Sequence, residues 1–461
     1  MEEVLGKILA ARDKRAALRA EISNSGRASL SLNLNIPGYP KSNEKIHLCF
    51  KMVLSELTRH LLSHRILVDV SAEYCATDEA GDFFLTPLLE ENYAIEEVKQ
   101  ISEQFEESHP LGRLLDVDIT NVSGEPVSSG KAKLCYFCNE KPALVCMREK
   151  NHPYHDIRNK IDSDIDVYLN NLDRERTCKD LASKALNSLL YEVALTPKPG
   201  LVDRFSNGSH DDMDFATFLN SASVLSVYFR DIAEYGYTFT DGDLKKAIPE
   251  LRRIGLLMED DMFRASKGIN THKGAIFLLV FSLFISAYLI SNQKFSYRAF
   301  VNLIQVLNGD LVERELGRKI LNENQTHGEI CFEKYGKKGM GIRGEVQAGL
   351  PCVFKHAIPV LELHLLNVNQ VSDKTLNSSL THALLALIAN NDDSNILYRK
   401  GVEILEELKQ KAQNAFVHFN DEKFEFLYQD LITYCDKNHI SPGGSADLLA
   451  LSYFIFTANK H

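Results

Sequence analysis

The chain lacks an excess of positive charge, any tryptophan, and any low-complexity tract or obvious internal repeat. Its 461 residues carry a net charge of -11, which argues against non-specific binding to nucleic acid or to an anionic membrane surface. Charged residues at 25% and hydrophobic residues at 44% are ordinary for a globular protein. Because the chain is too long for one ordinary core, two or three domains are expected.

The sequence also lacks a hydrophobic run long enough to make a membrane span the first choice. The uncharged run at residues 275–291 falls just short of the about 18 residues that would indicate a span. Ser282, Ser286 and Tyr288 dilute it, and no basic flank or aromatic belt follows it. We therefore expect a buried central helix there and no membrane association.

A secretion signal is missing as well, because the chain starts Met-Glu-Glu-Val-Leu rather than with basic and then apolar residues. Without such a signal, nine cysteines indicate free thiols in a reducing compartment, and we expect a cytoplasmic protein. Six of them stand singly among apolar residues and are expected to fill small spaces in the core: Cys49, Cys75, Cys178, Cys331, Cys352 and Cys435.

Two halves differ in their hydrophobic periodicity. Residues 1–175 alternate helical and extended patterns, which predicts an α+β domain with a mixed sheet. Its expected helices are 4–22 and 43–62, and its expected strands are 29–36, 66–75 and 114–119. Residues 176–461 have helical periods almost throughout and predict an all-α helical bundle. Its expected helices are 178–194, 215–235, 243–263, 275–291, 296–306, 376–390, 401–416 and 445–457, and a polar helical stretch at 170–176 joins the halves.

The helical half contains an unusual turn at residues 196–203, Thr-Pro-Lys-Pro-Gly-Leu-Val-Asp. It ends one helix and precedes an acidic cluster at the start of the next. A helix start already favours anions, so carboxylates gathered there make electrostatic sense mainly if a divalent cation joins them. The pattern favours a phosphate substrate bound with a metal. The charged residues of this segment are Lys198, Asp203, His210, Asp211, Asp212 and Asp214.

Four further polar clusters, all but 391–395 containing glycines, lie between helices at 267–274, 339–345, 391–395 and 441–447. Glycines let backbone N–H groups approach a ligand, an arginine binds phosphate in bidentate fashion, and carboxylates suit magnesium. Each cluster alone also fits an ordinary turn or helix cap, but five in one apolar bundle favour a site. The candidates from these clusters are His272, Lys273, Arg343, Glu345, Asp392 and Asp393.

These motifs resemble those of the triphosphoribosyl-dephospho-CoA synthase family over about residues 178–457. The resemblance implies joining of ATP to dephospho-CoA with release of adenine, which makes the prosthetic-group precursor of citrate or malonate lyase-type enzymes. It places Lys198, Lys273 and Arg343 on phosphates, with His210, His272 and Glu345 also in the substrate site. As Mg²⁺ ligands or acid/base groups it implies Asp203, Asp212, Asp214, Asp392 and Asp393.

The first half carries a pair of aspartates, Asp116 and Asp118, on an expected strand. Residues two apart on a strand point to the same face, so the pair either shares a Mg²⁺ ion or forms an ordinary polar sheet face. A rigid turn at 35–41 ends in Lys41, and the run 109–113 ends in Arg113.

A second candidate metal site combines Cys135, Cys138 and Cys146 with His152 or His155. The Cys-x2-Cys spacing can place two thiolates on one tetrahedral Zn²⁺, with the third cysteine and a histidine completing the set. The spacing matches no standard zinc finger, and a thiol-rich chain produces such clusters by chance, so both interpretations stay open.

These features resemble the apo-citrate lyase phosphoribosyl-dephospho-CoA transferase family over about residues 10–170. The resemblance implies transfer of the phosphoribosyl-dephospho-CoA group to a serine of the lyase acyl carrier subunit, with release of pyrophosphate. It implies metal or base roles for Asp116 and Asp118, and contacts to the triphosphate from Arg27, Lys41 and Arg113. Lys133 stands where the family leads us to expect arginine.

Together the halves predict one chain that makes this prosthetic-group precursor and attaches it, with ATP, dephospho-CoA and the carrier subunit as partners. One alternative is a metal-dependent nucleotide phosphohydrolase, because His210-Asp211 and His155-Asp156 are His-Asp doublets. The other is a non-catalytic zinc-knuckle interaction module on a helical scaffold.

Overall fold

The computed structural model describes residues 2–89, 93–128, 130, 133–316, 327–366 and 371–460. The chain divides into two compact units, Met1–Asp173 and Arg174–His461. Helix α5 (Tyr154–Ala194) runs through the boundary between them, so the predicted polar helical join at 170–176 lies inside a continuous helix.

The first unit is built on four strands, β1 (Ser29–Leu34), β2 (Tyr74–Asp78), β3 (Gly81–Pro87) and β4 (Leu115–Thr120). Their order is β2-β3-β1-β4, and every neighbouring pair is antiparallel. The α+β class is confirmed, but the sheet is antiparallel rather than mixed. The strand expected at 66–75 is mostly wrong. Asp69 accepts a hydrogen bond from the backbone N–H of Ser71 and starts a 3-10 turn at Val70–Ala72, a local alternative to strand pairing.

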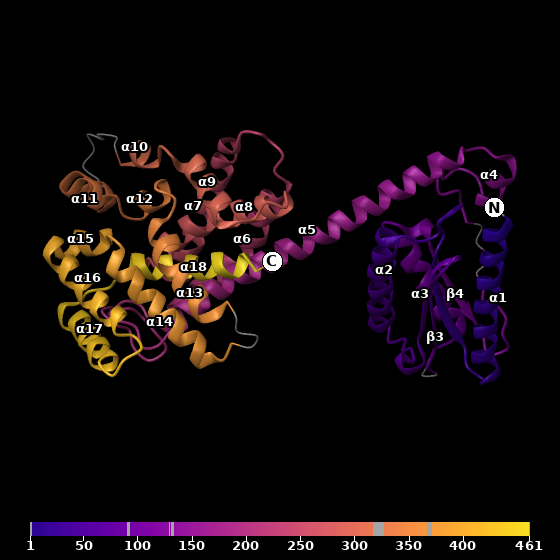
Figure 1. The fold of residues 1–461 in the computed structure, drawn as a ribbon, viewed down its shortest axis with the longest axis horizontal. Helices are drawn as coiled ribbons and strands as arrows, with labels where there is room; N and C mark the ends of the chain where they lie inside the picture. The colour runs from indigo at the N-terminus through magenta and orange to yellow at the C-terminus, as the bar shows by residue number, and fades with distance from the viewer. Residues whose placement is uncertain are drawn as a thin grey trace. The chain divides into compact units, whose positions relative to one another are not determined.

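Helices cover both faces of this sheet: α1 (Glu2–Asn24), α2 (Glu44–Ser63) and α3 (Ile95–Ser108). Figure 1 shows α1 and α2 on opposite sides of the strands. One face is apolar and packs Leu30, Leu32 and Val117 into a core with α2 and α3. The other face carries Asp116 and Asp118, which alternate with buried residues along β4 as the sequence predicts, and α1 lies over it.

Strand β4 forms one edge of the sheet, and side chains of α3 occupy the edge-facing backbone groups of Val117. Lys99 Nζ donates to the Val117 carbonyl at 3.0 Å, and Glu106 Oε1 accepts from the Val117 N–H at 2.6 Å. Both side chains are buried. At Val117 the edge is therefore closed by one cation and one carboxylate, and further along β4 the Val127 N–H donates to the Ile119 carbonyl at 2.9 Å.

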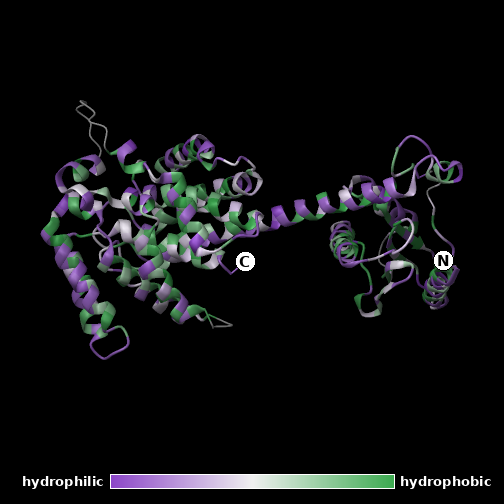
Figure 2. Cartoon of the chain, turned by 45° about the horizontal axis from the view of Figure 1, so that its top comes forward, coloured by the Kyte–Doolittle hydropathy of each residue, from purple (hydrophilic) through white to green (hydrophobic). Residues whose placement is uncertain are grey.

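The second unit is helical, and its described residues contain no strand. After α5, its longer helices are α6 (Phe215–Thr238), α7 (Ile248–Ala265), α8 (Lys273–Ser291), α9 (Tyr297–Asn308), α14 (Asp373–Asn390), α16 (Val402–Val417), α17 (Phe424–Asn438) and α18 (Gly443–Ala458). Shorter helices are α10 (Leu311–Glu315), α11 (His327–Tyr335), α12 (Gly341–Gln347), α13 (Ile358–Leu365) and α15 (Ser394–Lys400). Figure 2 shows hydrophobic residues concentrated in the inner helices. The all-α prediction is confirmed.

Helix α8 lies at the centre of this unit and contacts α6, α7, α9 and α18. It is long and apolar enough to cross a membrane, but 72% of its most apolar window is buried inside the protein. Gly236 of α6 allows close packing, because a Cβ there would stand 2.3 Å from the carbonyl oxygen of Phe284 in α8. The predicted buried central helix is confirmed.

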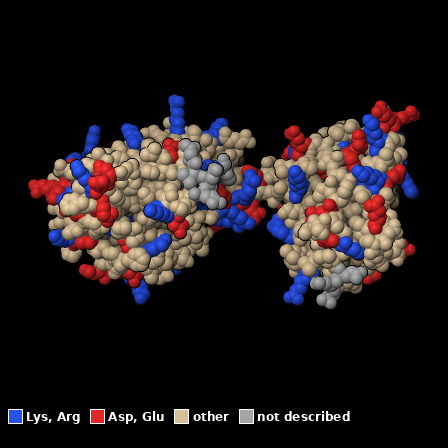
Figure 3. Space-filling view, turned by 60° about the horizontal axis from the view of Figure 1, so that its bottom comes forward, with Lys and Arg blue, Asp and Glu red and all other residues tan. Residues whose placement is uncertain are grey.

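On the face of each unit that Figure 3 shows, charged side chains are not sorted by sign. On the face shown in Figure 3, the Lys and Arg side chains intermingle with Asp and Glu on both units. Such mixing keeps the field of either sign local, so recognition of an anionic substrate depends on individual cavities.

Candidate active sites

The five polar segments of the helical unit meet around one cavity of about 340 Å³. They are separated by as many as 249 positions (447 - 198) between Lys198 and Asp447, yet both residues line the same space. The candidates that line it are Lys198, His210, Asp212, His272, Lys273, Arg343, Asp392 and Asp393. Asp203, Asp214 and Glu345 are not among the lining residues. Folding therefore gathers most of the predicted set at one place.

Lys198 lines the cavity and forms an ion pair with Glu192, an acid that the sequence analysis did not predict. Its Nζ donates to Glu192 Oε1 at 2.6 Å and to the Glu192 carbonyl at 2.9 Å. Both side chains are almost fully buried. Such a pair is sensitive to loss of either partner, because the remaining charge would be buried alone.

Asp203 and Asp214 hold local structure. Asp203 Oδ1 accepts from the backbone N–H groups of Phe205 and Ser206 at 2.8 and 2.9 Å, and Oδ2 accepts from that of Lys198 at 3.0 Å. Asp214 caps the N-terminus of α6 through the N–H of Thr217 at 2.8 Å. These contacts account for the first aspartate as the brace of the 196–203 turn and for the second as a helix cap.

Asp393 and Asp447 form the acidic part of the cavity with Glu192. Asp393 is 3% exposed, and its two oxygens accept from the N–H groups of Asn395 (2.9 Å) and Gly444 (2.8 Å). Burial raises the pKa of Asp393. Burial, with Glu192 and Asp393 nearby, raises the pKa of Asp447 well above its ordinary value. Asp447 is partly exposed and lines the cavity, so a ligand bound there can reach it.

Gly274 leaves the space that the Asp447 carboxyl occupies. A Cβ at this position in the first turn of α8 would stand 2.0 Å from Asp447 Oδ2. The glycine of the 267–274 segment thus serves a close approach between α8 and α18.

His272 is held as a neutral hydrogen-bond donor at the cavity. The Thr271 hydroxyl donates to Ser221 Oγ (2.8 Å), and the Ser221 hydroxyl in turn faces His272 Nδ1 (2.7 Å). Because the Ser221 hydroxyl donates its hydrogen bond to Nδ1, Nδ1 is unprotonated, and the neutral imidazole carries its proton on Nε2. Burial, and then Lys198, lowers the pKa of His272 to about 3. Among the described residues Nε2 is buried and has no hydrogen-bond partner, and a buried polar atom without a partner is rare in a folded protein.

The remaining candidates lie at the rim or behind it. Lys273 pairs with Glu259 at 2.8 Å, and Arg343 Nε binds Glu315 at 2.8 Å. Further contacts at the cavity and behind it are His210 Nε2 to Ser441 Oγ at 2.8 Å, Asp392 to Lys409 at 2.8 Å, and Glu345 to the N–H of Cys352 at 3.0 Å. Burial raises the pKa of Glu345. Within the described part of the chain the Nη groups of Arg343 make no hydrogen bond, and such donors are of the kind that bind phosphate.

In the first unit, Asp116 and Asp118 lie side by side on the polar face of β4. Lys133 Nζ contacts Asp116 Oδ1 at 2.7 Å, and Arg19 of α1 approaches Asp118 Oδ2 to 3.8 Å. Burial, followed by Asp116, raises the pKa of Asp118. Arg113 Nε donates to the Leu134 carbonyl at 3.0 Å, beside Lys133. The aspartate pair therefore faces cations, as a binding site for an anionic substrate with a metal would.

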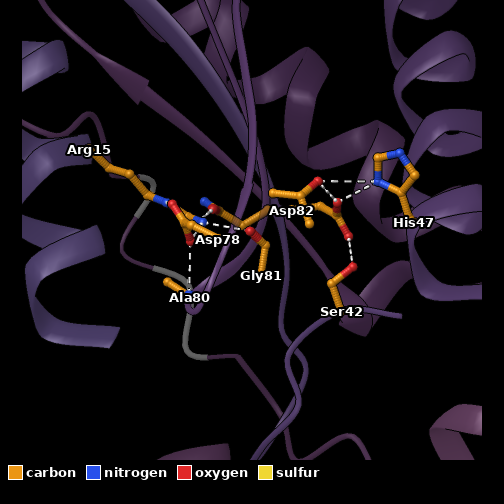
Figure 4. A network of polar contacts seen from close by, with 9 residues as sticks. Arg15, Ser42, His47, Asp78, Ala80, Gly81 and Asp82 are labelled. Atoms are coloured by element: carbon orange, nitrogen blue, oxygen red, sulfur yellow. Dashed lines mark hydrogen bonds and ion pairs between the residues drawn. The ribbon is translucent and has the colours of Figure 1, made fainter. Parts of the chain in front are cut away.

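A second polar network on this unit runs from α1 to α2 (Figure 4). Arg15 binds Asp78 and the Gly81 carbonyl, while Asp82 accepts from Ser42 at 2.5 Å and contacts His47 Nδ1 at 2.6 Å. Arg15 is the single buried residue of α1. The network fixes α1 and the β2-β3 turn, and the sequence offered no motif for it.

Arg27 and Lys41 do not join the aspartate pair through any contact among the described residues. Arg27 forms an ion pair with Asp69 at 2.5 Å, and Lys41 Nζ donates to the Ile36 carbonyl at 2.6 Å. Burial, followed by repulsion from Arg12 and Arg158, lowers the pKa of Lys41. Lys41 thus sits among cations, whereas Arg27 is already neutralised.

The three cysteines and His152 also come together. One ligand atom from each of Cys135, Cys138, Cys146 and His152 lies within 4.8 Å of the others. His155 instead pairs with Asp156 at 2.9 Å and is 76% exposed. The two His-Asp doublets lie in different units, His155-Asp156 in the first and His210-Asp211 in the second. They cannot form one metal centre within either unit.

Two families match the sequence. Residues 178–461 match CitG, ATP:dephospho-CoA triphosphoribosyl transferase, and residues 3–168 match CitX, apo-citrate lyase phosphoribosyl-dephospho-CoA transferase. Protein CitXG of Leuconostoc mesenteroides subsp. cremoris is 33% identical over 92% of this chain and 90% of its own. Protein CitXG of Haemophilus influenzae is 30% identical over 98% and 96%. A probable 2-(5''-triphosphoribosyl)-3'-dephosphocoenzyme-A synthase of Streptococcus equi subsp. zooepidemicus is 35% identical over 61% and 97%.

The matches extend over both halves of the chain, and the full-length relatives carry the same order of domains. They confirm the resemblance of each half and leave the phosphohydrolase and the non-catalytic scaffold without support. The chain belongs to the CitXG family, in which a CitX and a CitG domain are fused, and it is a bifunctional transferase of citrate lyase prosthetic-group biosynthesis.

Proposed function

We propose that the helical unit converts ATP and dephospho-CoA to triphosphoribosyl-dephospho-CoA and adenine in the cavity of about 340 Å³. The observation that carries this proposal is the meeting of five separate polar segments around one cavity that combines buried carboxylates with cations. Expulsion of adenine from the ATP ribose builds positive charge at the anomeric carbon, and carboxylates fixed near that carbon stabilise it.

Asp447 is our choice for the proton transfer. The attacking ribose hydroxyl loses its proton as the new C–O bond forms, and the departing adenine takes up a proton as the C–N bond breaks. A carboxyl whose pKa is raised by burial holds a proton more readily than an ordinary carboxyl, which suits it to proton transfer. Asp393 is braced by two backbone N–H groups and supplies fixed negative charge. Asp203 and Asp214 have no direct role in this assignment.

Asp212 and Asp392 fit a Mg²⁺ ion, because their partly exposed carboxylates line the cavity and oxygen ligands suit this metal. When bound, the ion would neutralise charge on the triphosphate. His272 Nε2 donates a hydrogen bond to the nucleotide, and Arg343 and Lys273 contact phosphate oxygens at the rim.

We further propose that the first unit transfers the phosphoribosyl-dephospho-CoA group to a serine of the citrate lyase acyl carrier subunit, with release of pyrophosphate. Asp118, whose pKa is raised by burial, accepts the serine proton, and Lys133 and Arg113 contact the pyrophosphate that leaves. Asp116 and Asp118 also fit a Mg²⁺ ion, as two neighbouring carboxylates. Arg27 and Lys41 stand outside this arrangement.

The first reaction is tested by measuring free adenine from ATP and Mg²⁺, with and without dephospho-CoA. Adenine that appears only with dephospho-CoA supports the proposal, whereas phosphate without adenine would refute it. Asp447→Asn should lose adenine release, and Asp421→Asn, a matched change at an exposed turn, should keep it.

The second reaction is tested by the mass of the purified carrier subunit after incubation with the first product. A gain equal to the phosphoribosyl-dephospho-CoA group, absent when the acceptor serine is replaced by alanine, supports the proposal. Asp118→Asn should remove the gain while adenine release continues. Unchanged carrier modification by Asp118→Asn would exclude it as the base.

A further inference from the structure

The four residues Cys135, Cys138, Cys146 and His152, called here the cysteine–histidine cluster, come from a short stretch of the first unit. Cys135 and Cys138 flank a tight turn, Cys146 lies on α4 (Ala143–Glu149), and His152 precedes α5. Their ligand atoms lie within 4.8 Å of one another. All nine cysteines of the chain are free thiols in the structure.

The spacing of the cluster matches a tetrahedral zinc site. With Zn–S bonds of about 2.3 Å, two thiolates on one tetrahedral ion stand about 3.8 Å apart. Cys138 Sγ and Cys146 Sγ are 3.7 Å apart, whereas a disulfide needs about 2.05 Å. The cluster supplies three sulfurs and one imidazole nitrogen, which is a common structural zinc set.

The surroundings of the cluster are those of metal ligands. Backbone N–H groups of Glu140 and Lys141 point to Cys138 Sγ, and Asn151 Nδ2 lies 3.8 Å from Cys146 Sγ. Donors of this kind stabilise thiolates and orient them. Nε2 of His152 is buried and has no hydrogen-bond partner among the described residues. An imidazole nitrogen buried without a partner costs free energy unless a ligand satisfies it.

The stretch also has almost no hydrophobic core to hold it. Among the described residues from 121 to 153, the only buried apolar side chains are Cys135 and Cys146, two members of the cluster. Larger apolar side chains nearby, such as Leu144 and Met147, are exposed. A segment that buries so little apolar surface needs another source of stability, and metal binding is one.

We propose that the cysteine–histidine cluster binds one structural zinc ion. The ion fixes the segment that carries Lys133 onto β4. Hydrogen bonds join Cys135 N to the Lys141 carbonyl at 2.7 Å and Ala143 N to the Lys133 carbonyl at 2.9 Å, which ties Lys133 to the base of the cluster. Lys133 in turn contacts Asp116 at 2.7 Å. The zinc proposal does not depend on the proposed function. The role of Lys133 in catalysis does, because it rests on the proposed carrier transfer.

The test uses the full chain, expressed with added zinc and freed of loosely bound metal by gel filtration. Zinc is measured by atomic emission for the wild type, Cys138→Ser, His152→Gln and the control Cys75→Ser, which changes an exposed cysteine of β2. We expect about one zinc per chain in the wild type and control and at least a fivefold loss in the two cluster variants. Thiols of the cluster should react with Ellman's reagent only after a chelator is added.

Three results would overturn the proposal: a wild type without stoichiometric zinc, an equal loss in the Cys75→Ser control, or a disulfide between Cys138 and Cys146. Adenine release should be unchanged in all variants, which shows that the helical unit is intact in each of them. If zinc binds but the wild type does not modify the carrier, the zinc site stands and the carrier transfer fails. If Cys138→Ser loses zinc yet modifies the carrier at the wild-type rate, the ion does not position Lys133.

Discussion

Gly274→Ala tests whether the position of the Asp447 carboxyl decides adenine release. The new Cβ would stand 2.0 Å from Asp447 Oδ2, and ordinary contact begins at 3.4 Å, so the carboxyl must retreat by about 1.4 Å (3.4 - 2.0). The clash involves the end of a side chain rather than backbone. The fold can accommodate it, and the helix propensity of alanine offsets part of the cost. Stability should therefore change little.

The expected effect falls on catalysis. Displacing a catalytic group by about 1 Å costs on the order of 100-fold in rate, so we expect kcat for adenine release to fall by about that factor at saturating ATP and dephospho-CoA. The double variant Gly274→Ala/Asp447→Ala should be no worse than Asp447→Ala alone, because both changes act on one carboxyl. The assay is chromatographic measurement of adenine, with a urea denaturation curve for each variant.

Gly255→Ala is the matched control, since Gly255 lies inside helix α7 and its nearest neighbour would be Val280 Cγ2 at 3.9 Å. It should leave kcat unchanged and raise the free energy of unfolding by up to about 1 kcal/mol. A folded Gly274→Ala variant that keeps kcat within about threefold of the wild type would refute the reasoning, because a group displaced by that much cannot be the proton-transfer residue.

Three other predictions concern single residues. Lys198→Met leaves Glu192 buried without its partner and should lower the free energy of unfolding by about 3–5 kcal/mol. Urea titration should show that adding Glu192→Gln recovers part of the loss. An unchanged free energy of unfolding in Lys198→Met alone would contradict this. The pKa of His272 is lowered from 6.5 to about 3. Below pH 6.5 the folded chain therefore binds fewer protons than the unfolded chain, and the free energy of unfolding decreases as the pH is lowered. Between pH 6 and 4 the free energy of unfolding of the wild type should fall by about 1.4 kcal/mol per pH unit more than that of His272→Gln. Urea titration at each pH measures both. Equal slopes against pH would mean that His272 becomes protonated in the folded protein as readily as in the unfolded one. Lys133→Ala should slow carrier modification at least tenfold without changing adenine release, with Lys133→Arg retaining most of the rate; mass spectrometry of the carrier decides, and equal rates for all three proteins would remove Lys133 from the site.

The sequence was sufficient for features with strong local periodicity. The apolar run that became α8 and the alternation that became β1 and β4 were readable, because each is set by which face of the element is buried. Strand β3 (Gly81–Pro87) was not predicted. It is buried along its whole length, and a short apolar run of this kind has no distinguishing period.

For the cavity of the helical unit, the sequence predicted the lining residues that lie in polar segments at helix ends. Lys198 and Asp393 were found because each lies in a polar segment between two helices, and both line the cavity. Glu192 lies within the long helix α5 and carries no local signal, so only the fold reveals that it pairs with Lys198. Asp203 shows the opposite case. Its motif was visible, but the same residue type serves as turn brace and as metal ligand, and sequence alone does not separate the two.

The closed edge of β4 bears on the proposed carrier transfer at Asp118, because it limits how a protein acceptor could approach. Many peptide-binding proteins take up a partner by adding its extended chain to a free strand edge. Here Lys99 and Glu106 already occupy the backbone carbonyl and N–H of Val117, so this route would break two buried hydrogen bonds. In the proposed carrier transfer, the acceptor serine would instead approach the aspartate pair from the α1 side of the sheet, presented on a protruding loop or helix end. Recognition would then depend on the shape of the folded carrier rather than on an extended sequence motif.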